Sequence, residues 1–313
     1  MRSSARPSRR TFVQTGGAAC LLGSASLSPL MAKTGRTAPP RSRETEPVIL
    51  KSLKIGMVKV DGNLTDKFRA AQKAGFQGVE LNCPGFDVAE AKAAIAATGL
   101  PVDGTVCSTH WKTTHTHADA NVRAQALEDL KTAIRDTHAV GGNTVLLVAG
   151  VGGDGEEAAI WTRAVENISQ ALPLAAQLGI TIAIENVWNR FMYDHSGGSE
   201  QTADAYAAFI DEFNSPWVGM QFDIGNHWKY GDCGSWIRTL NKRIVKLDIK
   251  GYSRSKNNWA KLGEDDINWP DVQAALKEIN FHGWAAAEVG GGGPARLQEI
   301  SQAMDACLGL NPA

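Results

Sequence analysis

The stretch VGMQFDIGNHWKY, residues 218–230, decides the fold of this chain. Its apolar residues alternate with smaller or polar ones, so the first six residues predict a strand with one buried face. The strand ends on Asp223, and a polar loop carrying Asn226 and His227 follows. A carboxylate at the C-terminal tip of a parallel strand, followed by a polar loop, is typical of the active-site end of a strand–helix barrel.

Seven further apolar runs are each followed by a helical stretch, and glycines stand just past several of the helices. Eight even units without a break in composition predict a single (β/α)8 TIM barrel over residues 51–310. A doubly wound open sheet is the alternative, but it rarely has eight such repeats. The predicted strands are residues 53–60, 77–82, 102–108, 144–149, 180–185, 218–223, 244–250 and 284–289, and the predicted helices are residues 64–74, 87–98, 118–140, 156–178, 199–213, 235–240, 269–279 and 294–308.

Composition sets bounds on the class of protein. The chain has 313 residues, of which 43% are hydrophobic and 21% charged, and its formal net charge is -1. These values fit one globular domain of barrel size. The near-neutral charge gives no basic surface for nucleic acid, so we expect no nucleic-acid partner. The five cysteines have no zinc-finger or redox spacing.

The first residues have the layout of an export signal. Residues 8–13, SRRTFV, contain paired arginines, and residues 16–32 form a mildly apolar run of small residues. We interpret residues 1–32 as a signal peptide of the twin-arginine type and expect a periplasmic or secreted protein. An uncleaved anchor or a basic tail is the alternative, but the run is too short for a stable membrane span. Residues 33–50 are rich in Pro, Arg and Thr and predict a linker.

Acidic side chains end the last four predicted strands. The period-two pattern turns Glu185, Asp223, Asp248 and Glu288 towards the barrel interior. In the seventh strand the inward face also carries lysines, among them Lys250. The carboxyl ends of parallel strands meet at one edge, so these acids are expected to converge at one rim.

Carboxylates that share a small space need their charge cancelled. A bound divalent cation is one solution, and protonation together with neighbouring lysines is the other. Alternatively, Lys246, Asp248 and Lys250 form a structural charge ladder. Four acids at equivalent strand ends favour the metal. Oxygen ligands favour Mn²⁺ or Mg²⁺, and Co²⁺ and Zn²⁺ remain open.

Several segments, taken together and in order, resemble the sugar phosphate isomerase/epimerase group, the xylose isomerase-like TIM barrels. The resemblance covers the chain from about Leu53 to Leu308. It implies a TIM barrel enzyme that moves a proton next to a sugar carbonyl with the help of one divalent metal. The matching segments are Gly78-Val79-Glu80-Leu81, Ala183-Ile184-Glu185-Asn186, Phe222-Asp223-Ile224-Gly225-Asn226, Leu262-Gly263-Glu264 with Asp266-Ile267, and Gly283-Trp284 running to Glu288-Val289.

The resemblance also implies a ligand set of Glu, Asp, His and Glu from strands five to eight. Glu185, Asp223 and Glu288 match three of these positions. Members of the family often have HxHxKD in strand seven, whereas this chain has KLDIK, so Asp248 stands where the ligand His is usual. The expected metal ligands are therefore Glu185, Asp223, Asp248 and Glu288, with His227 or His110 as alternative contributors.

The chemistry implied by the family needs a base on one face of the sugar and an acid on the other. We assign these catalytic roles to Glu185 and Glu288. The candidate substrate-binding residues lie after strands three, six and seven; they are His110, Trp111, Asn226, His227 and Lys250. Tryptophans in the same set of loops, among them Trp188, Trp228 and Trp259, offer stacking area for a sugar.

Three functions are compatible with this sequence. The first is a metal-dependent sugar isomerase or epimerase. The second uses the same metal and base on a 3-keto-glycoside, where proton removal expels a leaving group, as in a lyase or hydratase. The third is a sugar-binding barrel without catalysis. In each case the expected partner is a small sugar or keto-sugar, and homo-oligomer formation stays open.

Overall fold

The computed structural model describes residues 47–310. The predicted signal peptide and residues 33–46 of the predicted linker lie outside them. Within the described part of the chain, no helix is long and apolar enough to cross a membrane. The predicted twin-arginine signal falls in residues 1–32, outside the described residues, so it stays a prediction.

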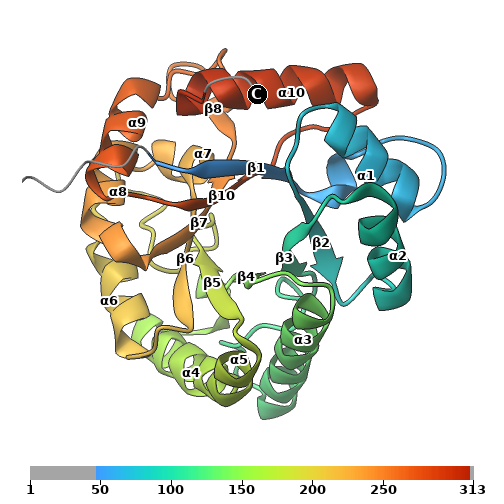
Figure 1. The fold of residues 1–313 in the computed structure, drawn as a ribbon. Coiled ribbons are helices and arrows are strands. Elements are labelled where there is room, and N and C mark those ends of the chain that lie inside the picture. Colours follow the sequence, from blue (N-terminus) through green and yellow to red (C-terminus); the bar gives the residue numbers. More distant parts are fainter. Residues whose placement is uncertain (1–46, 311–313) are drawn as a thin grey trace, which may run out of the picture. The chain divides into compact units, whose positions relative to one another are not determined.

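Eight parallel strands form a nearly closed barrel with the helices outside it (Figure 1). Neighbouring strands follow the order β1-β10-β7-β6-β5-β4-β3-β2. Strands β1 and β2 meet at a single bridge, between Lys54 and Glu80. This arrangement confirms the TIM barrel and excludes the doubly wound sheet. The strands are β1 (Ile49–Leu53), β2 (Val79–Cys83), β3 (Val102–Cys107), β4 (Thr144–Leu147), β5 (Thr181–Glu185), β6 (Val218–Asp223), β7 (Ile244–Ile249) and β10 (Gly283–Ala287).

The helices begin and end at side chains and glycines that suit those positions. The Asp87 side chain accepts a hydrogen bond from the Glu90 N–H and caps the second helix. Gly99, with φ of 71°, ends that helix in the left-handed region. The helices are α1 (Leu64–Lys73), α2 (Val88–Thr98), α3 (Ala120–Ala139), α4 (Glu157–Ser169), α5 (Leu172–Leu178), α6 (Asp204–Glu212), α7 (Ile224–Trp228), α8 (Cys233–Leu240), α9 (Trp269–Glu278) and α10 (Pro294–Leu308), with short 3-10 turns at Ile55–Met57, Gly152–Asp154 and Asn241–Arg243.

The first strand differs most from its prediction. It runs over Ile49–Leu53 rather than 53–60, because a 3-10 turn, Ile55–Met57, follows it directly. Ile49 and Leu50 therefore belong to the barrel, although the sequence pattern placed them in the linker.

Three other segments also differ from their predictions. The long helix predicted over 156–178 is two helices, because Pro173 cannot donate a backbone hydrogen bond and stands in the first turn of α5. The predicted loop after β6 is the short helix α7, which the Asp223 side chain caps by accepting from the Asn226 N–H. A hairpin of β8 (Gly251–Ser253) and β9 (Asn258–Ala260) was not predicted.

The two faces of the strands divide as the alternation predicts. On β6, Phe222 packs outward against Trp236 of α8, with ring centroids 6.0 Å apart. The neighbouring Gln221 turns inward and donates to Asp248, 2.9 Å away. The barrel interior is therefore filled largely by polar and charged side chains.

Candidate active site

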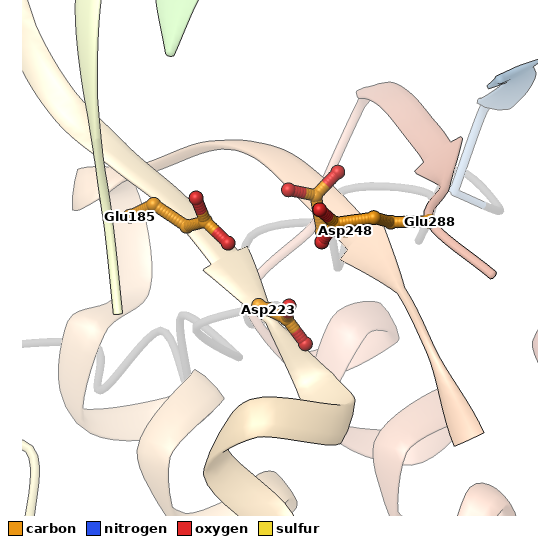
Figure 2. A group of neighbouring side chains, drawn as sticks. All are labelled: Glu185, Asp223, Asp248 and Glu288. Atoms are coloured by element: carbon orange, nitrogen blue, oxygen red, sulfur yellow. The ribbon is translucent and has the colours of Figure 1, made fainter. Parts of the chain in front are cut away.

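Four carboxylates converge at the C-terminal end of the barrel. Glu185 ends β5, Asp223 ends β6, Asp248 lies near the end of β7, and Glu288 follows β10. One oxygen from each lies within 4.8 Å of the others (Figure 2). The structure thus brings together all four residues of the predicted metal site.

Strand register explains the convergence. Asp223 and Asp248 are paired residues on β6 and β7. Ala286 of β10 pairs with Asp248, and Glu288 follows two positions later on the same inward face. Because the strands of a barrel are tilted and staggered, this offset brings Glu288 to the same rim. Figure 2 shows Glu185 and Glu288 approaching the centre from opposite sides.

Two lysines lie against the acids. The Lys250 ammonium is 3.1 Å from Asp223 and 2.7 Å from Glu288. The Lys54 ammonium is 3.2 Å from Asp248 and 2.8 Å from Glu80. The lysines therefore cancel part of the charge of the cluster. Lys250 lies in the site as predicted.

A second charged layer lies deeper in the barrel. Lys246 is fully buried, and its ammonium is 2.6 Å from Glu80 and 2.8 Å from Asp103. Asp103 also accepts a hydrogen bond from the Ser52 hydroxyl. Gln221 bridges the two layers, since its amide donates to Glu80 at 3.4 Å and to Asp248 at 2.9 Å. The hydrogen bonds of Gln221 therefore connect Asp248 at the rim to this deeper layer.

Burial raises the carboxyl pKa values at the rim. Burial and the neighbouring Glu288 raise the pKa of Glu185 well above its usual value. Burial likewise raises the pKa of Asp248 to about 7, although Lys54 opposes the shift. For Glu288, burial is outweighed by Lys54 and Lys250, which lower its pKa. Burial also raises the pKa of Asp223, although Lys250 opposes the shift. Three of the four carboxyl groups are thus poorly compensated as anions.

The donor set fits a divalent metal ion. Mn²⁺ and Mg²⁺ prefer carboxylate oxygens, and here four carboxylates offer oxygen atoms close together. The ion would be held by Glu185, Asp223, Asp248 and Glu288. Asn226 keeps two of them in place: its N–H donates to Asp223 at 2.8 Å, and its side-chain amide lies 3.4 Å from Glu185.

His110 lies beside the site in a defined protonation state. Its Nδ1 accepts from the Val148 N–H at 3.2 Å, so the neutral ring carries its proton on Nε2. Burial, with a further contribution from Lys54, lowers the pKa of His110 to about 4. Trp111 packs edge-on against this ring and is 54% exposed. His110 is therefore a neutral donor next to the acids, and Trp111 is available to a ligand.

His227 was predicted to bind substrate, but its side chain lies in the aromatic layer behind β6, against Phe222 and Trp236. The side chain is fully buried, and its ring lies 3.6 Å from the ring of Trp236, centroid to centroid. Its Nδ1 pairs with the Tyr193 hydroxyl at 3.0 Å. His227 turned away from the rim because α7 begins directly at Asp223 and carries it into the layer behind β6. Asn226 lies at the site, in contact with Asp223 and Glu185, and its role in substrate binding stays a prediction.

An aromatic wall stands at the edge of the acid cluster. Trp188 and Trp259 stack with centroids 4.8 Å apart, and Trp188 donates to the Asn226 carbonyl at 2.8 Å. The Lys250 ammonium is 5.0 Å from the Trp259 ring centroid, and Trp259 is 46% exposed. Trp228, in contrast, is buried and donates to Asp266. Only part of the predicted tryptophan cluster is therefore open to a ligand.

Lys54 is the site residue that sequence reasoning missed. The misplaced first strand hid it, because a strand over 53–60 gives Lys54 no special position. With β1 at Ile49–Leu53, the same alternation puts Ser52 and Lys54 on the inward face. The alternation therefore indicates the inward position of Lys54, but the prediction began the first strand at residue 53 instead of residue 49.

A cavity of about 880 Å³ lies at the other end of the barrel. It is lined by the start of β1, the end of α10 and residues that include Lys51, Ser301 and Asp305. Lys51 and Asp305 form an ion pair of 2.6 Å there. This cavity holds none of the converging carboxylates, so the candidate site is at the opposite rim.

The chain is similar in sequence or fold to several known sugar epimerases and isomerases. L-ribulose-5-phosphate 3-epimerase UlaE of Salmonella paratyphi C is 25% identical over 234 residues, which cover 70% of this chain and 79% of the relative. The 2-oxo-tetronate isomerase of Pectobacterium atrosepticum is 25% identical over 243 residues, covering 75% and 89%. The apo crystal structure of 3-keto-D-glucoside 4-epimerase from E. coli has the same fold, with a TM-score of 0.69, 17% identity, and coverage of 84% of this chain and 99% of that one.

The two sequence relatives are a sugar epimerase and an isomerase, and they support the prediction of an isomerase or epimerase over a barrel that only binds sugar. A model of one family matches residues 68–308, which is most of the chain. The chain belongs to the xylose isomerase-like TIM barrel family.

Proposed function

We propose that this protein is a metal-dependent sugar isomerase or epimerase that moves a proton next to a sugar carbonyl. The observation that carries the proposal is the convergence of four carboxylates at the C-terminal rim. Such a rim is where TIM barrel enzymes place their catalytic groups. The relatives that act on sugars support the same chemistry.

Glu185, Asp223, Asp248 and Glu288 would hold the metal, most readily Mn²⁺ or Mg²⁺. When bound, the ion supplies polarisation of the sugar carbonyl and of the hydroxyl next to it. The chain's own residues then move the proton. One carboxylate takes it from the carbon beside the carbonyl, and an enediolate forms.

The opposed positions of Glu185 and Glu288 suit the second half of the reaction. After one of them has taken the proton, the other returns a proton from the opposite side, which inverts the carbon. Return of the proton to the neighbouring carbon, together with transfer of the hydroxyl proton from one oxygen of the enediolate to the other, instead isomerises the sugar. The His110 Nε2–H and the exposed ring of Trp111 are the groups proposed to orient the substrate.

The deciding experiment is turnover of a panel of ketoses and keto-glycosides by Glu185→Gln and Glu288→Gln. Each change removes a proton-transferring group while preserving its shape, so we expect a loss of about 10²–10⁴-fold in kcat. Glu128→Gln alters an exposed glutamate on α3 and serves as the control. Near-normal turnover by both site variants would refute the assignment, and loss of turnover with a chelator tests the metal.

A second candidate, a 3-keto-glycoside lyase or hydratase, is favoured by the aromatic wall. The stacked Trp188 and Trp259 offer apolar area beside the acids for a second ring, which a glycoside has and a free ketose lacks. Product analysis separates the two functions. A mass-neutral change supports the isomerase or epimerase, whereas a released aglycone or unsaturated sugar supports the lyase.

We also propose that the protein is exported, on the basis of Arg9 and Arg10 in the twin-arginine pattern. Fractionation of cells that carry the full chain tests this. We expect the wild type in the periplasm or medium and the Arg9→Lys, Arg10→Lys double variant retained inside. Equal distribution of the two would refute export by this route.

A further inference from the structure

Lys54 touches the acid cluster but has no part in the proposed proton transfer. Its ammonium is 3.2 Å from one oxygen of Asp248, and Gln221 donates to the other oxygen at 2.9 Å. Both oxygens of Asp248 are therefore already engaged by side chains. The Lys54 side chain is 13% exposed, so solvent screens this contact only weakly.

The charges around the site explain why a lysine stands there. The four carboxylates carry a formal charge of -4, and the two ammonium groups of Lys54 and Lys250 reduce it to -2. One divalent cation brings this site to neutrality. Without Lys54 the same four acids would keep a formal charge of -3, so they would attract a divalent ion more strongly.

Lys54 also has a second partner that lets it release Asp248. Its ammonium is 2.8 Å from Glu80, a buried carboxylate that Lys246 holds at 2.6 Å. When an ion takes the Asp248 oxygen, Lys54 keeps its contact with Glu80. The lysine is therefore not left as an unpaired buried charge, which would be costly.

We propose that the Lys54 ammonium takes over part of the role of a metal ion in the cluster of Glu185, Asp223, Asp248 and Glu288. It holds Asp248 while no divalent ion is bound, and it lowers the affinity of the cluster for that ion. It is a positioning residue, since it acts through Asp248. The inference rests on the proposed function only in that a divalent ion binds the cluster. It adds to that function a role for Lys54, which keeps the bound metal ion exchangeable.

The experiment is calorimetric titration of Mn²⁺ into chelator-stripped wild type, Lys54→Met and Lys51→Met. Methionine keeps the length of the side chain and removes its charge. We expect Lys54→Met to bind Mn²⁺ at least about tenfold more tightly, because a like charge beside the ion is gone. Lys51 is on the outer face of the same strand and pairs with Asp305, so its variant is expected to bind Mn²⁺ like the wild type.

Thermal unfolding gives a second readout that needs no substrate. Without metal, Lys54→Met should melt at a lower temperature than the wild type, because Glu80 and Asp248 lose a buried partner. Saturating Mn²⁺ should then raise its Tm by more than it raises that of the wild type. Should this variant not fold, the Lys54→Met, Glu80→Gln double variant removes the lysine with its anchor charge, and the same increase in affinity is expected.

Unchanged or weaker Mn²⁺ binding by the Lys54 variants would overturn the inference and leave metal-dependent catalysis standing. No Mn²⁺ binding by the wild type or any variant would also overturn it. Turnover by the wild type that is insensitive to chelator would separately overturn the metal dependence of the proposed function.

Discussion

Two charged layers in the same barrel interior are built differently. In the deeper layer, Glu80 and Asp103 are both ion-paired with Lys246, which is fully buried. At the rim, Lys54 contacts Asp248, and Lys250 contacts Asp223 and Glu288. The fourth carboxylate, Glu185, accepts from the amide of Asn226 at 3.4 Å. Similar residue types thus form one layer in which each carboxylate has a lysine partner and another layer with an excess of negative charge.

The difference separates a structural role from a functional one. A buried ion pair with good geometry is costly to break, and it gives no affinity for an external cation. A cluster with excess carboxylates at an accessible rim is instead prepared for a positive ligand. Alternation along a strand cannot distinguish the two, because both layers use the inward face.

The largest effect is expected in the deeper layer. Lys246→Met leaves Glu80 and Asp103 as buried charges without their shared partner. We expect a loss of about 3–5 kcal/mol in the free energy of unfolding. Urea unfolding followed by circular dichroism measures it. A loss below about 1 kcal/mol would show that this layer is not held together by its ion pairs.

The matched change at the rim is Asp248→Asn. It removes one of the excess charges, so the metal-free protein should keep or gain stability, while Mn²⁺ affinity falls by at least about 100-fold. Urea unfolding and calorimetric titration measure the two quantities. A strong loss of metal-free stability would place Asp248 with the structural layer.

The pH dependence of the metal-free protein is expected to show the excess charge at the rim. Burial raises the pKa of Asp248 to about 7, and it also raises the pKa values of Glu185 and Asp223, so the folded state holds protons that the unfolded state releases near pH 4. This contribution to stability is present at low pH and is lost as the pH rises through 7.

Buried histidines oppose this effect. Burial lowers the pKa values of His110, His115 and His227, so their neutral rings add stability as the pH rises through about 6.5, where an unfolded histidine titrates. These histidines act alike in the metal-free and the metal-bound protein, so the difference between the two forms isolates the carboxylates. We expect the metal-free protein to lose about 1 kcal/mol relative to the Mn²⁺-saturated protein between pH 6.5 and 8.5. Urea unfolding at several pH values measures both forms, and the same pH dependence in both would contradict the pKa assignments.

The smallest expected effect concerns the aromatic rim. Trp259→Ala removes an exposed ring beside Lys250, so the substrate KM should rise by about 2- to 12-fold at constant kcat, equivalent to about 0.5–1.5 kcal/mol. Trp228→Phe is the control. It loses the hydrogen bond to Asp266 and should lower the Tm without changing KM. Steady-state kinetics on the substrate found in the screen decides between them, and equal KM values would remove Trp259 from the site.

Much of the fold followed from periodicity. The acids at the ends of β5, β6 and β7 were placed correctly because period-two alternation fixes which face a residue joins. The first strand was misplaced because residues 49–60 are apolar throughout much of their length, and only the tertiary contact of β1 with β10 selects its register. The β8–β9 hairpin had no turn signal clear enough to predict it.

The site was less predictable than the fold. His227 follows Asp223 closely in sequence, but helix α7 turns it into the aromatic core beside Trp236. Lys54 and Glu185 are far apart in sequence, and nothing local indicates that they share one cluster. Pairing between lysines and acids across the barrel depends on side-chain reach, which a single sequence does not contain.

The most direct test is a crystal soaked with Mn²⁺ and measured at a wavelength that reveals manganese by its anomalous scattering. We expect one anomalous peak, in contact with oxygens of Glu185, Asp223, Asp248 and Glu288, and none in the deeper layer around Lys246. A fully soaked crystal with no peak among these four carboxylates would contradict the claim that they form a metal site.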